Sequence, residues 1–446
     1  MILDQIFLDR MKEMLGSDYP AFFASLNGDR TYGLRFNALK VSDEALAELI
    51  ALLDKELGCE LEPIEWEKRG FYYPSDVQPG KTALHEIGAF YIQEPSAQSA
   101  VPCLCVEPGD VVLDLCAAPG GKSTQILSYL NNTGLLVSNE IVKDRAQILA
   151  SNIERMGATN SVVVNESPDV LAKAFAMTFD KILIDSPCSG EGMFRKNPDA
   201  VSEWSVENVD TCIARDDDIL NAAAVMLKLG GRMVYSTCTF EYGENEGAIE
   251  RFLSTHEDFE CVKMHRLYPH EVRGEGHFYA ILKRSGEHAG DINNRKNKKK
   301  TSGAKGEASA LKDYYEFVKG CLTDSQRWSD ESRLKMINDQ LILIDPLSPD
   351  LSGLHVVRSG LQLGFFKKNR FEPSHTLAMA LKTEDVKQCH ECSAEEIEKF
   401  LRGETLNVDS QLKGWTLVCY KGIAAGWGKA AGGVLKNHYP KGLRRY

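Results

Sequence analysis

The sequence predicts an α/β protein whose central domain is a mostly parallel β-sheet with helices on both faces. Between about residues 96 and 284, short aliphatic runs alternate with helical patterns, as expected for such a sheet. A loop of small residues, Cys116 to Lys122, separates one aliphatic run from a helical pattern. Two further cysteines, Cys188 and Cys238, each follow an aliphatic run. These positions predict a ligand site, because open parallel sheets bind ligands beyond the carboxyl ends of their strands.

The elements of this domain are expected in a regular order. A helix after Glu140 stops at Gly157, and a long helix through Leu220 ends at Gly230-Gly231, since glycine is common just after a helix. The expected strands are residues 111–113, 135–137, 162–164, 181–185, 232–236 and 277–282.

The loop within LDLCAAPGGKS, residues 113–123, favours a nucleoside cofactor. Small residues let bare backbone and a helix N-terminus approach an anionic group. A phosphate-binding GxxxxGK[ST] loop would need glycine where Cys116 stands, and the dinucleotide pattern GxGxxG is absent. Glu140 ends the next aliphatic strand about twenty residues after Gly120, where an acidic residue accepts hydrogen bonds from ribose hydroxyls. An adenosine-type cofactor without a pyrophosphate remains, and S-adenosylmethionine fits best; the alternative is a tight loop in an unrelated α/β domain.

The two cysteines beyond the strands are placed as reactive thiols rather than as core residues. Cys188 follows the strand that ends at Asp185, and Cys238 follows the strand that ends at Ser236. If these strands are neighbours, about 4.8 Å apart, both thiols reach a single bound ring. Methylation of a pyrimidine at C5 needs such a thiol, because a thiolate added at C6 makes C5 nucleophilic. Two incidental buried thiols are the alternative.

Asp185 is the candidate for contact with the same ring. Its carboxylate can bind the N3/N4 edge and stabilise a protonated adduct, or it can simply bond backbone amides at the strand end. A thiolate is favoured by nearby positive charge, to which a helix beginning beyond Phe240 can contribute. The residues alone leave open which cysteine attacks the ring.

Composition and charge exclude several classes of protein. A net charge of −12 and a pI near 5.5 argue against binding to nucleic acid by bulk charge, although local basic patches could still bind it.

The sequence has no signs of export or membrane insertion. The first fifteen residues resemble an amphipathic helix rather than a signal peptide, and no window suits a membrane span. Twelve cysteines without an export signal indicate reduced thiols in a cytoplasmic protein. The only CxxC, Cys389 to Cys392, is expected to be a solvated helix start, and no metal is predicted.

Changes in composition divide the chain into five segments. The N-terminal segment, residues 1–95, contains three polar residues that are interpreted either as phosphate contacts or as a charged, exposed strand edge: Arg35, Asn37 and Lys40. The linker, residues 285–312, contains a basic cluster that can touch RNA or simply be solvated: Arg295, Lys296 and Lys298 to Lys300. The segments are an N-terminal domain 1–95, the central domain 96–284, a flexible basic linker 285–312, a small domain 313–385 and a final module 386–446.

Four motifs in order resemble those of the Sun-family RNA cytosine-5 methyltransferases: LDLCAAPGGKS, NEIVKDRAQIL, ILIDSPCSGEGMFRKNP and MVYSTCTFEYGENE. Within that family, YIQEPSA, FEPSHTLAMAL and the closing GWGK…KNHYPKGLR resemble bacterial members that act on 16S ribosomal RNA. The resemblance covers nearly the whole chain except the linker. It implies a Rossmann-like, S-adenosylmethionine-dependent methyltransferase core with a mostly parallel seven-stranded sheet, an N-terminal α+β RNA-binding domain and a C-terminal PUA-like RNA-binding module.

The resemblance also implies roles for individual residues. The family assigns attack on the base to the Thr-Cys thiol, here Cys238, and a part in product release to the Pro-Cys thiol, here Cys188. Asp185 faces both base and cofactor. The cofactor is further expected to contact Glu140 and the loop residues Cys116, Ala117, Ala118, Pro119, Gly120, Gly121 and Lys122. Where many relatives have an aspartate near the adenine amino group, this chain has Asn165-Glu166-Ser167, so that contact is left unassigned between Glu166 and Ser167.

Taken together, the expected activity is S-adenosylmethionine-dependent methylation of cytosine C5 in 16S ribosomal RNA, with Cys238 as the nucleophile. The expected partner is that RNA, free or within the small ribosomal subunit, with no membrane and no obligate protein partner. Such a target must be unstacked into the pocket from folded RNA. The alternatives are the same chemistry on transfer RNA, or a non-catalytic ribosome-assembly factor that only binds RNA.

Overall fold

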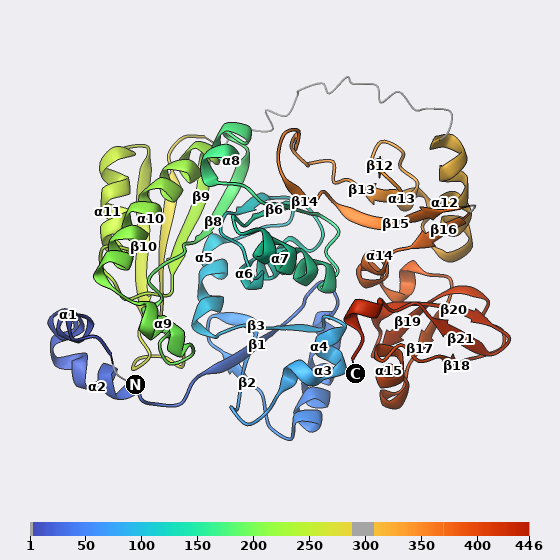
Figure 1. Ribbon diagram of the computed structural model, residues 1–446, viewed down its shortest axis with the longest axis horizontal. Helices are drawn as coiled ribbons and strands as arrows, with labels where there is room; N and C mark the ends of the chain where they lie inside the picture. The colour runs from blue at the N-terminus through green and yellow to red at the C-terminus, as the bar shows by residue number, and fades with distance from the viewer. Residues whose placement is uncertain (1–2, 288–306, 369, 446) are drawn as a thin grey trace.

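The computed structural model describes residues 3–287, 307–368 and 370–445 (Figure 1). The basic cluster at 295–300, expected in the linker, lies outside these residues. The final residues assigned to the linker, 307–312, form the beginning of helix α12, Glu307–Cys321. Within the described ranges, no helix is long and apolar enough to cross a membrane.

The central domain contains a large twisted sheet in the order β10-β11-β9-β8-β5-β6-β7-β14. The five strands from β9 to β7 are parallel, whereas β10, β11 and β14 pair antiparallel at the two edges. The strands are β5 Val111–Asp114, β6 Leu135–Asn139, β7 Ser161–Val164, β8 Phe179–Asp185, β9 Leu227–Thr237, β10 Phe259–Leu267, β11 His277–Arg284 and β14 Val356–Arg358. Seven strands belong to the central domain, as expected, and β14 comes from the segment that follows it.

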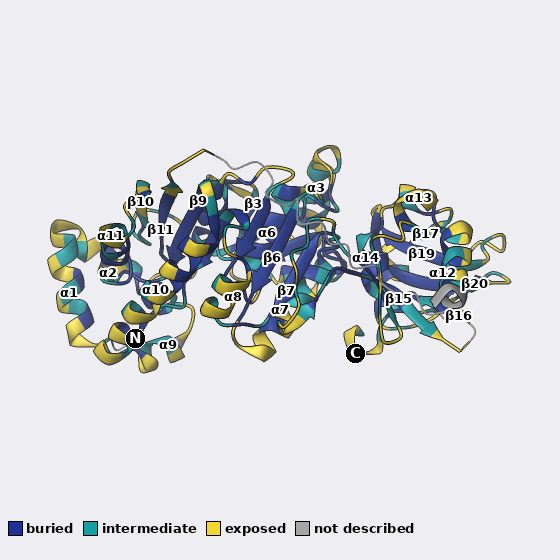
Figure 2. Cartoon of the chain, turned by 90° about the horizontal axis from the view of Figure 1, so that it is seen from above, coloured by how far each residue is buried: buried dark blue, intermediate teal, exposed yellow. Residues whose placement is uncertain are grey.

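Helices cover both faces of this sheet because its strands are apolar on both sides. Leu113 packs against one helix layer and its neighbour Val112 against the other. Figure 2 shows the strands buried between these layers. The first layer contains α8 Pro168–Ala174, α10 Val206–Met226 and α11 Glu246–Thr255; the second contains α5 Ala100–Leu104, α6 Gly121–Leu130 and α7 Lys143–Arg155; α9, Pro198–Glu203, lies outside both.

The N-terminal segment has two parts, a small sheet and a pair of helices, that belong to different hydrophobic cores. Its antiparallel sheet has the order β2-β3-β1-β4 and carries α3. By contrast, Phe7 of α1 and Phe22 of α2 pack against Phe194, Trp204 and Phe240 of the central domain. These helices and strands are α1 Gln5–Leu15, α2 Tyr19–Ser25, β1 Tyr32–Phe36, α3 Asp43–Leu57, β2 Glu62–Ile64, β3 Glu67–Tyr73, α4 Ala83–Glu86 and β4 Phe90–Ile92.

Both interpretations of the basic residues near β1 are wrong. Arg35 is buried, and its guanidinium donates to Gly121 O at 3.1 Å and to Thr124 Oγ1 at 2.9 Å. Asn37 is also buried, and Lys40 Nζ donates to Ile87 O at 2.8 Å. Arg35 and Asn37, whose Nδ2 donates to Met156 O at 2.9 Å, therefore join the N-terminal sheet to the central domain, because buried donors need internal acceptors. The hydrogen bond of Lys40 to Ile87 lies within the N-terminal domain.

The C-terminal segment folds around two sheets, β12-β13-β15-β16 and β17-β19-β20-β21-β18. One hydrophobic core joins them: Trp427 packs on Phe317 with ring centroids 5.8 Å apart, and its indole N–H donates to Ser374 O. Their elements are α12, α13 Ser325–Trp328, β12 Leu334–Ile337, β13 Gln340–Leu343, β15 Leu361–Lys367, β16 Arg370–Pro373, α14 His375–Ala380, β17 Cys389–Glu391, α15 Ala394–Leu401, β18 Leu406–Asn407, β19 Gly414–Tyr420, β20 Ile423–Ala431 and β21 Val434–Asn437.

The last module also packs against the N-terminal sheet. Phe400 and Ile397 of α15 share a core with Leu34 and Phe90. Arg445 forms ion pairs with Glu86 and Glu398, at 3.2 and 3.5 Å. The N-terminal sheet and the final module, far apart in sequence, therefore lie side by side (Figure 1).

The expectation of a solvated helix start at the CxxC pair is wrong. Cys389 to Glu391 forms strand β17, and Cys392 is buried. The helix α15 begins only afterwards, where Ser393 accepts a hydrogen bond from Glu396 N. Apolar contacts of Cys392 with the core of this module explain its burial.

Candidate active site at the sheet edge

The small-residue loop connects β5 to α6 beyond the carboxyl end of the sheet. Its backbone is held by neighbouring strands: Leu115 N donates to Leu183 O and Ala117 N to Asn139 O, at 2.9 and 2.8 Å. Gly120 begins α6 with φ +114°, and a Cβ there would lie 3.2 Å from Leu149 Cδ1. A larger residue at this position is therefore disfavoured by both conformation and space.

Lys122 and Asp185 form an ion pair at the start of α6 and the end of β8. Lys122 Nζ lies 2.7 Å from Asp185 Oδ1, and Ser236 Oγ donates to the same oxygen at 2.9 Å. Burial alone would raise the pKa of Asp185, but the charge of Lys122, with His277 and the hydrogen bonds, brings the pKa below its ordinary value. Asp185 is therefore a carboxylate at neutral pH.

Glu140 is buried directly after β6. Val142 N donates to its Oε1 at 2.9 Å, and Arg145 Nη1 lies 3.6 Å from its Oε2. Arg145 also donates to Ala118 O at 2.8 Å, which joins Glu140 to the small-residue loop. The carboxylate thus has a fixed position beside the loop.

The two thiols lie together because β8 and β9 are neighbouring parallel strands. Cys188 Sγ and Cys238 Sγ are 3.3 Å apart. The hydrogen bond with Cys238 and burial raise the pKa of the Cys188 thiol well above its ordinary value. Cys188 therefore keeps its proton at neutral pH.

A network of polar side chains fixes the two cysteine loops relative to each other. Glu244 accepts hydrogen bonds from both the backbone N–H and the hydroxyl of Ser189, next to Cys188. The Ser189 hydroxyl lies 2.7 Å from Thr239 Oγ1, next to Cys238. Asn245 Nδ2 donates to Thr239 O at 3.0 Å. Glu244 and Asn245, in the sequence GENE after the second cysteine, therefore connect the two loops; sequence analysis missed this role.

A cavity of about 220 Å³ joins the loop, the ion pair and one thiol. Cys188, Gly120 and Glu140 are not among the residues that line it. His277 and Lys196 line it and were not expected from the sequence, although a histidine that opens a strand at this edge was a possible signal. The residues predicted for the site that line this cavity are Cys116, Ala117, Ala118, Pro119, Gly121, Lys122, Asp185 and Cys238.

Glu166, one of the two candidates for the adenine contact, already has a partner. Its Oε1 accepts hydrogen bonds from the backbone N–H of His355 at 2.7 Å and lies 2.8 Å from the Nδ1 of the same residue. His355 precedes β14, so the C-terminal segment contacts the central sheet at this edge. No group of three or more side chains suited to a metal ion occurs in the part of the chain that the structure describes.

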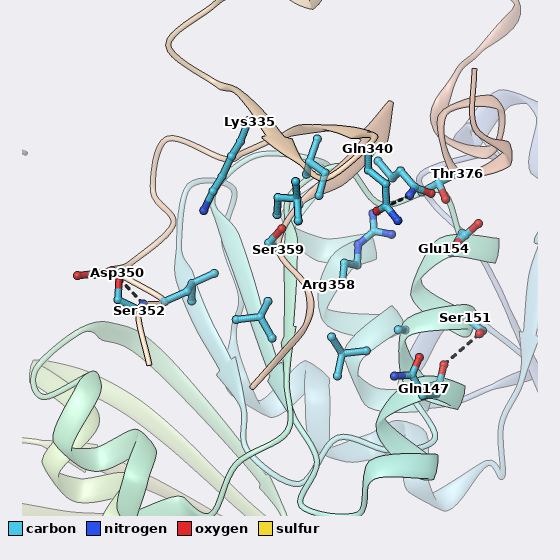
Figure 3. Close-up of a pocket in the computed structure, with 18 residues that line it drawn as sticks. Gln147, Ser151, Glu154, Lys335, Gln340, Asp350, Ser352, Arg358, Ser359 and Thr376 are labelled. Atoms are coloured by element: carbon cyan, nitrogen blue, oxygen red, sulfur yellow. Dashed lines mark hydrogen bonds between the residues drawn. The ribbon is translucent and has the colours of Figure 1, made fainter. Parts of the chain in front are cut away.

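A second cavity, of about 520 Å³, lies between α7 and the C-terminal segment. Figure 3 shows Gln147, Ser151 and Glu154 of α7 on one side and Lys335 and Gln340 on the other. Neither cysteine of the candidate site nor the small-residue loop lines it. This cavity is therefore separate from the candidate active site.

Family models match four parts of the chain. Their descriptions are the N-terminal domain of 16S rRNA methyltransferase RsmF over residues 3–95, 16S rRNA methyltransferase RsmB/F over 101–283, the RsmF rRNA methyltransferase first C-terminal domain over 316–381, and the methyltransferase RsmF PUA domain over 387–445.

Individual proteins are similar over the same length. The ribosomal RNA small subunit methyltransferase F of Vibrio vulnificus strain YJ016 is 32% identical over 472 residues, covering 99% of this chain and 98% of that protein. Its counterpart in Aliivibrio fischeri strain ES114 is 32% identical over 100% of this chain and 98% of its own length. The crystal structure of a methyltransferase homologue from Pyrococcus horikoshii is 26% identical, with a TM-score of 0.57, and covers 63% of this chain and 95% of that chain.

Proposed function

Because this chain belongs to the RsmF family of 16S ribosomal RNA methyltransferases, we propose that it methylates C5 of a cytosine in 16S ribosomal RNA. The methyl donor is S-adenosylmethionine, and the nucleophile is Cys238. The observation that carries this proposal is the pair of sulfur atoms 3.3 Å apart, one of which lines the cavity beside the small-residue loop. A binding protein without catalysis would have no need for this arrangement.

The residues around the loop suit S-adenosylmethionine. The loop presents backbone groups and small side chains to the cavity, and the ion pair of Lys122 with Asp185 closes one side of it. We assign the contact with the ribose hydroxyls to Glu140, which Arg145 holds beside the loop although Glu140 does not line the cavity. When bound, S-adenosylmethionine supplies an electrophilic methyl group on a sulfonium sulfur.

Cys238 begins the reaction on the RNA base. Its thiolate adds to C6, the C5–C6 double bond opens, and C5 becomes nucleophilic. After C5 has gained its methyl group, a base takes the C5 proton. The electron pair of that C–H bond restores the C5–C6 double bond, and the C6–sulfur bond breaks with its electron pair returning to Cys238. The enzyme is then free and the product is 5-methylcytosine.

Asp185 and Cys188 act on the same ring from neighbouring positions. The Asp185 carboxylate accepts hydrogen bonds from the N4 amino group and from N3–H once the adduct is protonated. Lys122 holds this carboxylate in its ionised form. Cys188, a protonated thiol in contact with Cys238, assists the elimination that releases the product.

The regions outside the catalytic domain hold the RNA. The N-terminal sheet and the final module share a core, and we assign RNA binding to both of them together. The partner is a folded RNA, free or in the small ribosomal subunit, from which one cytosine is unstacked into the cavity.

Bisulfite sequencing of 16S and transfer RNA, from cells with and without the gene, tests the proposal. Loss of one or a few cytosine marks in 16S RNA is the expected result. Loss confined to transfer RNA would keep the chemistry and change the substrate. Unchanged marks in both RNAs would favour the non-catalytic assembly factor.

A further inference from the structure

His277 lies beside the proposed nucleophile at the edge of the sheet. Strand β11 runs antiparallel to β9, and the last pair at this end joins Phe278 to Thr237. His277 precedes Phe278 and Cys238 follows Thr237, so both residues adjoin this pair, and both line the cavity.

The imidazole of His277 is buried but has no internal partner for one of its nitrogens. The residue is 3% exposed, and its Nε2 makes no hydrogen bond. It lines the cavity together with Lys122, Asp185 and Cys238. Buried polar atoms in proteins are almost always hydrogen-bonded, so an unpartnered nitrogen on a residue that lines the cavity suits a contact with a ligand.

The imidazole is uncharged at neutral pH. Burial and the nearby charge of Lys122 lower the pKa of His277 to about 3, although Asp185 opposes this. An imidazole with so low a pKa is a poor general base, and its neutral form still carries one N–H. It therefore suits a fixed hydrogen bond rather than removal of the C5 proton.

The proposed substrate needs a donor at this place. A cytosine offers N4–H₂ as a donor group and O2 as an acceptor, and the Asp185 carboxylate can only accept. The two lysines that line the cavity are less suited to be this donor. Lys122 is paired with Asp185, and Lys196 is exposed to solvent. Attack at C6 moves electron density toward N3 and O2, so a donor to O2 stabilises the adduct more than the free base.

We propose that His277 contacts the target cytosine and donates a hydrogen bond to its O2. This inference rests on the proposed function and adds a residue to it. Loss of this donor removes one buried hydrogen bond, which corresponds to a decrease of about 10- to 100-fold in kcat/KM for RNA. Affinity for S-adenosylmethionine should change by less than about twofold, since the proposed contact is with the base.

Three variants test this with 16S RNA as the substrate. His277→Phe removes the donor, whereas His277→Gln restores an N–H near the position of Nε2 and should keep activity within a few-fold of the wild type. His265→Phe, on the neighbouring strand β10, is the control, because His265 is exposed and outside the cavity. A merely structural role would lower the melting temperature or the cofactor affinity of His277→Phe and would not be rescued by glutamine.

The adduct itself gives a second measurement. RNA with 5-fluorocytidine at the target traps the covalent complex, because fluorine at C5 cannot leave as a proton does. His277→Phe should form this complex about 10- to 100-fold more slowly than the wild type. Equal rates in the two proteins would overturn the role of His277. If the wild type itself forms no complex, the proposed adduct chemistry fails instead.

Discussion

The sulfur atoms of Cys188 and Cys238 are 3.3 Å apart, although fifty residues separate them in the chain. The pairing of β8 with β9 brings the strand ends together, and Glu244 joins the loops that follow. Their proximity allows one thiol to attack the base while the other assists release. The first two predictions below separate these roles.

Cys238→Ala should abolish methyl transfer while S-adenosylmethionine still binds with wild-type affinity. The substitution removes the nucleophile and leaves the small-residue loop intact. Transfer of a labelled methyl group measures turnover, and calorimetry measures cofactor binding. Cys105→Ala, at an exposed position, is the control. A Cys238→Ala protein with full turnover would exclude the proposed adduct.

Cys188→Ala should accumulate a covalent complex between enzyme and RNA. The adduct with Cys238 still forms, but its elimination is slowed. A denaturing gel detects the complex as a band of reduced mobility. The Cys188→Ala, Cys238→Ala double variant should not show it. Free enzyme alone in the single variant would count against a role of Cys188 in release.

Glu244→Ala should lower turnover by at least about tenfold without loss of cofactor affinity, because it removes two hydrogen bonds that position the Cys188 loop. Glu244→Gln retains an acceptor and a donor at this position and should keep most of the activity. Glu250→Ala, which removes only an exposed contact with Tyr242, is the control. Equal turnover of the alanine and glutamine variants would show that these bonds do not position the thiols.

Asp216→Asn should stabilise the protein more at pH 8 than at pH 5.5. Burial raises the pKa of Asp216 to about 7, despite hydrogen bonds from Ser186 and Tyr235. The native state therefore keeps a proton that the unfolded state loses above its lower pKa, and stability falls as pH rises toward 7 by up to about 1.4 kcal/mol per pH unit. Asparagine removes this dependence.

Urea unfolding at the two pH values measures the effect at Asp216. Asp218→Asn, exposed on the same helix, should shift stability equally at both. A difference between Asp216→Asn and the wild type that does not vary with pH would contradict the prediction.

Arg358→Met should destabilise the attachment of β14 to the central sheet by about 1–3 kcal/mol. The buried guanidinium of Arg358 donates to Ala158 O at 2.8 Å and to Ser161 Oγ at 3.2 Å, and methionine leaves both without a partner. A lower urea midpoint is the expected readout. Arg370→Met, which breaks an exposed ion pair with Glu372, should cost less than about 1 kcal/mol. Equal effects would refute the anchoring role of Arg358.

Local sequence determined most of the central fold because periodicity reports directly on strands and helices. The end of α10 is an exception: the helix ends at Met226, and the glycines expected to end it, Gly230 and Gly231, lie within β9. The small-residue loop, the strand ends at Asp185 and Ser236, and the two cysteines beyond them were all visible in this way. Their meeting at one edge followed from a general property of parallel sheets. The motif resemblance added the chemistry, which neither periodicity nor spacing contains.

Only the tertiary structure decided which polar residues are buried and what they contact. Arg35 and Asn37 are polar residues for which the sequence allows an exposed position, but in the structure they donate to the carbonyls of Gly121 and Met156 across two domains. The pairing of β14 with β7, and that of β9 with β11, which brings His277 near Cys238, depend on strand register between distant segments. Sequence patterns describe one element at a time, whereas contacts of this kind arise from the packing of several elements.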